Sequence, residues 1–155
     1  MKKIDLKKLL ISVAISLGAG GLAALLTGAG SDFYASVEKP ALAPPAWLFP
    51  AVWTALYILM GVSAYLVYGS VCSSRRTALT VYAVQLAVNF VWSLVFFNAK
   101  AFLFAFILII VLWALIVAMI ALFSRCSRLA AYLQIPYFLW VTFAAYLTRA
   151  IYVLN

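Results

Sequence analysis

The sequence contains no histidine and very few acidic residues. Its 155 residues include three side-chain carboxylates, those of Asp5, Asp32 and Glu38. Zinc and haem centres commonly depend on imidazole ligands, and catalysis by a carboxylate pair needs two acids at one site. The sequence therefore lacks the parts of these conventional catalytic centres, and we expect neither a metal ion nor a required cofactor.

Cysteine is also scarce. The two cysteines, Cys72 and Cys126, fit neither the dense framework of a small disulfide-stapled domain nor the spacing of a zinc motif. We therefore expect both to be free thiols.

Charge is rare and apolar residues are abundant. Charged residues make up 9% of the chain and hydrophobic residues 69%, with a mean hydropathy of +1.17. A helix needs about 20 mostly apolar residues to cross a bilayer, and the hydrocarbon region requires every backbone group to be satisfied within the segment. The sequence predicts an all-α membrane protein, a five-helix transmembrane bundle forming a single domain over residues 1–155. The expected spans are about residues 9–26, 46–68, 77–97, 102–123 and 129–154.

The first span also has the order of a signal peptide, because a basic start precedes an apolar run. That run is long for a signal peptide and ends without an A-x-A cleavage motif. A retained span is therefore favoured.

The basic residues indicate an orientation. They lie at the ends of the apolar runs, which is typical of membrane topology and not of nucleic-acid binding. Eight of the eleven lie at the N-terminal end of the predicted bundle, namely Lys2, Lys3, Lys7, Lys8, Arg75, Arg76, Arg125 and Arg128, against Lys39, Lys100 and Arg149 at the other end. Because cytoplasmic loops are enriched in Lys and Arg, we predict a cytoplasmic N-terminus and an external C-terminus in a bacterial cell membrane. Both cysteines would then face the reducing cytosol.

The connection over residues 27–45 is the longest and contains the proline-rich stretch "EKPALAPPAW". Loops longer than about 12–15 residues are usually lids, binding loops or disordered, and prolines restrict the conformations of the free loop. A plain connector explains Pro44 and Pro45 as residues of a helix start, but it does not explain the length. We predict that the loop covers a ligand pocket.

Three predicted spans carry aromatic or amide side chains at helical spacing. The stripes are Trp53, Tyr57 and Met60 in the second span, Gln85, Asn89 and Trp92 in the third, and Tyr137, Trp140 and Ala144 in the fifth. Pro136 precedes the last stripe and removes a backbone donor, so we expect a bend there. Such stripes either pack against neighbouring helices or line an apolar pocket. From the residues alone, packing is the favoured interpretation.

Three blocks of sequence resemble one known family. They are "EKPALAPPAWLFPAVWTALYILMGVSAYLVY" (38–68), "QLAVNFVWSLVFF" (85–97) and "IPYFLWVTFAAYLTRAIYVLN" (135–155). They are similar to the translocator protein family, also called tryptophan-rich sensory protein, TspO/MBR and peripheral benzodiazepine receptor. The likeness spans at least four of the five segments and keeps their order and spacing, which makes it specific.

The resemblance implies a five-helix bundle, commonly a homodimer, with a pocket below the first long loop. Family members bind porphyrins such as protoporphyrin IX, many bind sterols or isoquinoline-type drugs, and some bacterial members promote light-dependent porphyrin degradation. By motif, the pocket positions are Tyr34, Trp53, Asn89, Trp92, Trp140 and Ala144. The remaining candidate ligand-binding residues, taken from the stripes, are Tyr57, Gln85 and Tyr137. The resemblance moves the interpretation of the stripes from packing to a ligand site.

Further candidate roles follow from the resemblance. Lys39 and Arg149 are candidate rim cations for the propionates of a porphyrin, and Trp53 with Trp140 are candidate redox partners in photo-oxidative degradation. Val141, Tyr146 and Arg149 match a sterol pattern that is weak by nature.

Two positions depart from the family motif. Leu42 stands where the family has Trp, so we expect one aromatic wall of the pocket to be missing. Ala51 stands where the family has Pro, which relaxes the start of the second span.

The leading functional prediction is a membrane receptor or sensor that binds a porphyrin or another hydrophobic ligand. One alternative is a transporter of hydrophobic metabolites such as tetrapyrroles or sterol-like lipids, although the sequence shows no internal repeat. Another is a structural or regulatory membrane subunit, for which the small residues of "ISLGAGGLAALLTGAG" would provide close helix contacts.

Overall fold

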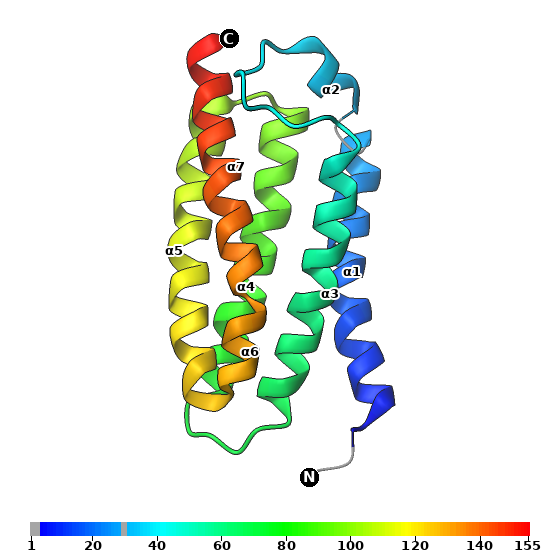
Figure 1. The fold of residues 1–155 in the computed structure, drawn as a ribbon, viewed down its shortest axis with the longest axis vertical. Coiled ribbons are helices and arrows are strands. Elements are labelled where there is room, and N and C mark those ends of the chain that lie inside the picture. The colour runs from blue at the N-terminus through cyan, green and yellow to red at the C-terminus, as the bar shows by residue number, and fades with distance from the viewer. Residues whose placement is uncertain (1–3, 29–30) are drawn as a thin grey trace.

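The computed structural model describes residues 4–28 and 31–155, and in this part of the chain all regular structure is helical (Figure 1). Five segments are long and apolar enough to cross a membrane, which confirms the predicted all-α architecture. They are α1 (Leu6–Thr27), α3 (Leu48–Tyr68), α4 (Arg75–Ser93) with the π-helical η2 (Leu94–Asn98), α5 (Phe102–Cys126), and α6 (Arg128–Leu133) with α7 (Ile135–Leu154).

The odd number of spans places the start of α1 and the end of α7 at opposite ends of the bundle (Figure 1). We call the end where α1 begins and the α3–α4 loop lies the N-terminal end, and the other the loop end. Lys2 and Lys3, which the orientation prediction counted, lie outside the described residues, as do residues 29 and 30 of the predicted loop.

Helix α1 has a defined cap at each end. The Asp5 carboxylate accepts a hydrogen bond from the Lys8 backbone N–H at 3.2 Å, and this bond lowers the pKa of Asp5 below its ordinary value. Gly28 ends the helix with φ of 59°, in the left-handed region that glycine adopts without steric cost. The span therefore ends where the sequence supplies a stop signal.

Two glycines allow α1 and α3 to approach closely. A Cβ at Gly61 would lie 2.5 Å from the Val13 Cα, and a Cβ at Gly20 would lie 2.1 Å from the Tyr57 ring. The Ser12 hydroxyl donates to the Gly61 carbonyl at 2.7 Å across the same contact. Small residues thus bring these helices together, as is common between transmembrane helices.

The third span ends in a π-helical turn that the sequence analysis did not predict. In η2 the backbone N–H of Ala99 donates to the Leu94 carbonyl at 3.1 Å, five residues earlier. The side chain of Asn98 donates to the Leu26 carbonyl at 2.9 Å and joins this turn to α1. Turns of this kind often occur at functional sites.

The fifth span is interrupted, as the position of Pro136 predicted. Helix α6 ends at Leu133, and α7 begins at Ile135 with the proline in its first turn, where a missing N–H costs no hydrogen bond. The Ser63 hydroxyl donates to the Ala130 carbonyl at 2.7 Å and fixes α6 against α3.

The expectation of free thiols was wrong. Cys72 and Cys126 form a disulfide with a Cα–Cα distance of 5.3 Å. The bond joins the α3–α4 loop to the last residue of α5, at the N-terminal end of the bundle. Sequence spacing gave no indication of it because the two positions meet only when the helices pack.

The first loop is tied to the bundle. It contains a short helix, α2 (Ser31–Ser36), in which the buried Phe33 ring packs against Phe96 and Phe97 at centroid distances of 5.0 and 5.3 Å. The backbone N–H of Glu38 donates to the Asn155 side-chain oxygen at 3.0 Å, and the Asn155 amide donates back at 3.1 Å. The loop is therefore anchored to η2 and to the end of α7, which a plain connector does not require.

Candidate functional site

A cavity of about 220 Å³ lies at the loop end, between α3, the α4–η2 segment and α7. Its walls are almost entirely apolar and rich in aromatic rings, which is the usual make-up of a small-molecule site. The lining residues are Tyr34, Ala46, Trp47, Phe49, Pro50, Trp53, Trp92, Phe96, Phe97, Trp140, Ala144, Leu147, Thr148 and Ile151.

Five of the nine predicted ligand-binding residues line this cavity. They are Tyr34, Trp53, Trp92, Trp140 and Ala144, from the loop and three different helices. Residues predicted to share a helical face thus direct their side chains into one cavity.

The loop forms the roof of the cavity through Tyr34. The Tyr34 hydroxyl donates to the Pro44 carbonyl, and its ring meets the edge of Phe49 at a centroid distance of 5.1 Å. Burial raises the pKa of the Tyr34 phenol, so it remains a protonated donor at neutral pH. Lys39 donates to the Tyr34 carbonyl at 2.8 Å, and its Nζ lies 5.0 Å from the Tyr34 ring centroid. The predicted rim cation Lys39 is therefore held against the roof.

Aromatic rings in contact form the walls. Trp92 stacks on Phe96 at a centroid distance of 5.3 Å and lies 6.4 Å from Trp53, while Trp140 meets Phe49 at 5.9 Å. The indole N–H groups of Trp92 and Trp140 are buried without a hydrogen-bond acceptor among the described residues. A buried unpaired donor costs about 1–3 kcal/mol.

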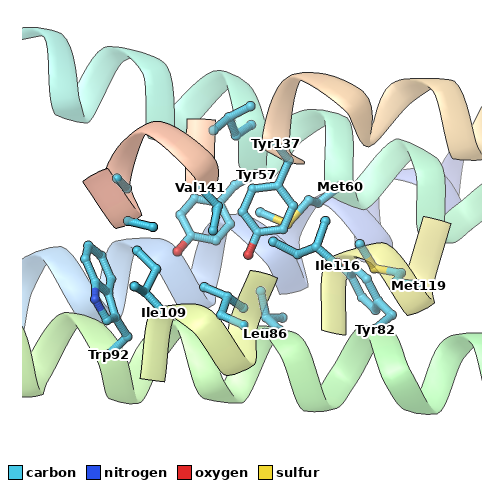
Figure 2. Close-up of a cluster of buried hydrophobic side chains, with 14 of the residues drawn as sticks. Tyr57, Met60, Tyr82, Leu86, Trp92, Ile109, Ile116, Met119, Tyr137 and Val141 are labelled. Carbon is cyan, nitrogen blue, oxygen red and sulfur yellow. The ribbon is translucent and has the colours of Figure 1, made fainter. Parts of the chain in front are cut away.

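The four other predicted residues lie outside this cavity and form a hydrogen-bond network deeper in the bundle. The Tyr137 hydroxyl donates to the Gln85 side-chain oxygen at 2.7 Å, and the Asn89 amide donates to the hydroxyls of Tyr137 and Tyr57 at 3.2 and 3.3 Å. Figure 2 shows the two tyrosine hydroxyls side by side and pointing in the same direction. The network joins α3, α4 and α7.

This network also positions one wall of the cavity. Trp53 stacks on Tyr57 at a centroid distance of 5.7 Å and meets Tyr137 edge-on at 6.2 Å. The polar residues predicted as ligand contacts thus support the aromatic wall from behind.

The structure does not bring the residues of the sterol pattern onto one surface. Val141 is fully buried, whereas Tyr146 is 44% exposed and Arg149 is also exposed. Arg149 does not line the cavity. Leu42 is 69% exposed and lies outside the cavity wall as well, and Ala51 is exposed at the start of α3.

Sequence reasoning missed several lining residues. Phe96 and Phe97 both reach the cavity from η2, although adjacent residues of an α-helix point about 100° apart. Trp47, just before α3, is exposed and also lines the cavity. The sequence feature that could have indicated these lining residues is the concentration of aromatic residues at the ends of the spans nearest the long loop.

The described part of the chain holds no group of three or more His, Cys, Asp or Glu side chains placed to hold a metal ion.

Comparison with known proteins gives one consistent result. The model of the TspO/MBR family matches residues 11–154. The chain is 35% identical to the "Tryptophan-rich protein TspO" of Chlorobaculum tepidum over 99% of this chain and 98% of that protein. It is 33% identical to the protein of the same name from Archaeoglobus fulgidus, over 98% and 99% of the two chains. It is 31% identical to the human "Translocator protein", over 91% of this chain and 85% of that protein.

Proposed function

Because the chain belongs to the TspO/MBR family of integral membrane proteins, we propose that its cavity is a receptor site for a flat, largely apolar ring compound, with a tetrapyrrole such as protoporphyrin IX as the ligand. The observation that carries the proposal is the cavity itself, whose walls are apolar and are formed largely by aromatic rings in contact with one another. A ring that stacks on such walls gains affinity from its buried apolar area.

The size of the cavity bears on how such a ring binds. Ligand sites usually measure about 300–1,000 Å³, so a cavity of about 220 Å³ takes in only part of a tetrapyrrole. A smaller space of about 80 Å³ lies toward α1 and shares Trp53, Trp92 and Phe97 with it. We infer that one edge of the ring enters among these aromatic residues while the propionates stay at the mouth, near Lys39.

We propose light-dependent degradation of the ligand as an activity of the same site. The excited ring would accept one electron from Trp53 or Trp140 and pass it to dioxygen, which becomes superoxide. The tryptophan radical would then take an electron back from the ring, so that the ring is the species oxidised and the tryptophan is restored. Trp53 lies within 6.4 Å of Trp92 and Tyr137 by ring centroids, so its radical has aromatic neighbours to share the charge. No acid–base catalyst is needed for this step.

Transport of a hydrophobic metabolite is the second candidate, since several relatives carry the name "Translocator protein". A transporter needs an access route at each end of its binding site. Here the loop covers one end, and the hydrogen-bond network of Tyr57, Gln85, Asn89 and Tyr137 lies deeper in the bundle. This arrangement favours a receptor over a channel-like path. Flux of protoporphyrin IX into sealed proteoliposomes would favour transport instead.

Titration of the purified protein with protoporphyrin IX, followed by absorbance, tests the proposal. Ala144 lines the cavity and is 6% exposed, so Ala144→Leu should overfill it. Overpacking costs about 1–3 kcal/mol, which predicts roughly 5- to 150-fold weaker binding. The matched control is Ala118→Leu, on an exposed position of α5, and it should bind as the wild type does. Equal affinity of all three proteins would exclude this cavity as the site.

A further inference from the structure

A second hollow lies at the N-terminal end of the bundle and shares no residue with the candidate site. It measures about 390 Å³ and is lined by Lys8, Ile11, Ser12 and Ile15 of α1, Ala64, Tyr65 and Tyr68 of α3, and Leu79 and Tyr82 of α4. We call it the α1 groove. We propose that the α1 groove binds an acyl chain of an anionic phospholipid, with the lipid phosphate held by Lys8 and Arg75.

The apolar part of the groove faces the bilayer. Ile11 and Ile15 are 49% and 58% exposed, and α1 is the least buried of the five spans. The Ser16 and Tyr82 hydroxyls, 2.6 Å apart, join α1 to α4 beside the groove. An open apolar groove on a membrane-spanning helix contacts lipid, and this one is lined by residues of α1, α3 and α4.

The mouth of the groove carries positive charge. Lys8 lines both the groove and an adjoining recess formed by Asp5, Tyr65 and Tyr68 among others. Arg75 begins α4, and its Nη1 lies 3.4 Å from the Ser70 carbonyl, two residues beyond Tyr68. Both cations are therefore on the side where a phospholipid headgroup lies when its chain fills the groove.

The charge is only partly neutralised by the protein. Lys8 pairs with Asp5 at 3.2 Å, which is the one ion pair in the described part of the chain. Arg75 and its neighbour Arg76 make no ion pair there. A lipid phosphate supplies the missing anion, because basic residues at the membrane surface are attracted to anionic headgroups by about 1 kcal/mol each. The Tyr65 hydroxyl, which accepts from the Asp5 backbone N–H at 2.9 Å, still has its own proton to donate.

A second copy of this chain is the competing occupant of the groove. A two-fold contact there would place the same surface against itself and bring Lys8 and Arg75 of one copy close to their equivalents in the other. Like charges in such a position disfavour association. Charge complementarity therefore favours the lipid.

The test is native mass spectrometry of the full-length protein, released from detergent after addition of phosphatidylglycerol or phosphatidylcholine. We expect the wild type to retain phosphatidylglycerol in preference. Lys8→Gln and Arg75→Gln should each lower its apparent affinity about fivefold. Ile15→Trp, which fills the apolar part of the groove, should also reduce retention.

The matched control is Arg125→Gln, at the same end of the bundle but on α5 and outside the groove. It should retain phosphatidylglycerol as the wild type does, and all variants should keep wild-type titration with protoporphyrin IX if they are folded. Equal retention of phosphatidylglycerol and phosphatidylcholine by the wild type would overturn the proposal. It would also be overturned if Arg125→Gln and Arg75→Gln lowered the retention of phosphatidylglycerol equally. If Ile15→Trp left lipid retention unchanged and abolished a dimer, the occupant would be a second copy and the proposal would be wrong.

Discussion

Removal of the Tyr137 hydroxyl should destabilise the bundle more than removal of the Tyr57 hydroxyl. Tyr137→Phe leaves the buried Gln85 oxygen without its 2.7 Å donor and takes one acceptor from the Asn89 amide. Hydrogen bonds between transmembrane helices contribute about 0.6 kcal/mol on average and up to about 1.7 kcal/mol, while an unpaired buried group costs about 1–3 kcal/mol. We expect the free energy of unfolding to fall by about 1–2 kcal/mol.

Tyr57→Phe is the matched comparison. It removes a single acceptor at 3.3 Å from the Asn89 amide, which keeps its bond to Tyr137. The expected loss is about 0.5 kcal/mol or less. Reversible unfolding of each protein in mixed micelles of mild detergent and dodecyl sulfate, followed by circular dichroism, measures both values.

The same pair distinguishes support of the site from direct ligand contact. Phenylalanine keeps the ring that meets Trp53 edge-on, so Tyr137→Phe should leave the affinity for protoporphyrin IX within about twofold, less than the loss of one neutral hydrogen bond. Equal destabilisation by the two variants would refute the network reasoning. A large loss of affinity with unchanged stability would show that the Tyr137 hydroxyl contacts the ligand directly.

Three other predictions follow from the site, the helix contacts and the charges. When each protein is saturated with protoporphyrin IX, Trp53→Phe and Trp140→Phe should slow the light-driven loss of porphyrin absorbance much more than they weaken binding, because Phe is harder to oxidise than Trp. Equal decay rates in the wild type and both variants would show that neither tryptophan takes part in the chemistry. Gly61→Ala should lower the free energy of unfolding by about 1–3 kcal/mol by overpacking, whereas Gly18→Ala, where a Cβ meets nothing within 4 Å, should not; similar unfolding curves would contradict the close contact. In a cysteine-free background, Ala43→Cys should react with a membrane-impermeant thiol reagent in intact cells, and protection would reverse the proposed orientation.

The spans could be predicted from the sequence because they depend on local properties. Length, hydropathy and the need to satisfy the backbone within the bilayer fix a helix almost without tertiary information. The break before Pro136 follows from the missing N–H. The stripe faces also follow from helical periodicity, which is why Trp92 and Ala144 reach the same cavity.

Depth within the bundle could not be predicted in the same way. Gln85 and Trp92 lie on one helical face, yet one belongs to the network and the other lines the cavity. The depth of a residue along the bundle axis depends on how far α3, α4 and α7 are shifted along one another. The π-helical turn at Leu94–Asn98 likewise changes the direction of Phe96 and Phe97 by an amount that no regular period describes.

The disulfide and the basic residues give opposing indications of the compartment at the N-terminal end. Disulfides persist mainly in oxidising compartments, whereas Lys and Arg are enriched on the cytoplasmic side. The 5.3 Å between the Cα atoms of Cys72 and Cys126 falls in the usual disulfide range and results from the packing of α5 beside the α3–α4 loop. The two sulfur atoms therefore meet in this fold whichever way it lies in the membrane, while the basic residues act on orientation itself during insertion. The orientation thus rests on the charges, and labelling at Ala43, far from the disulfide, decides it without any contribution from the native cysteines.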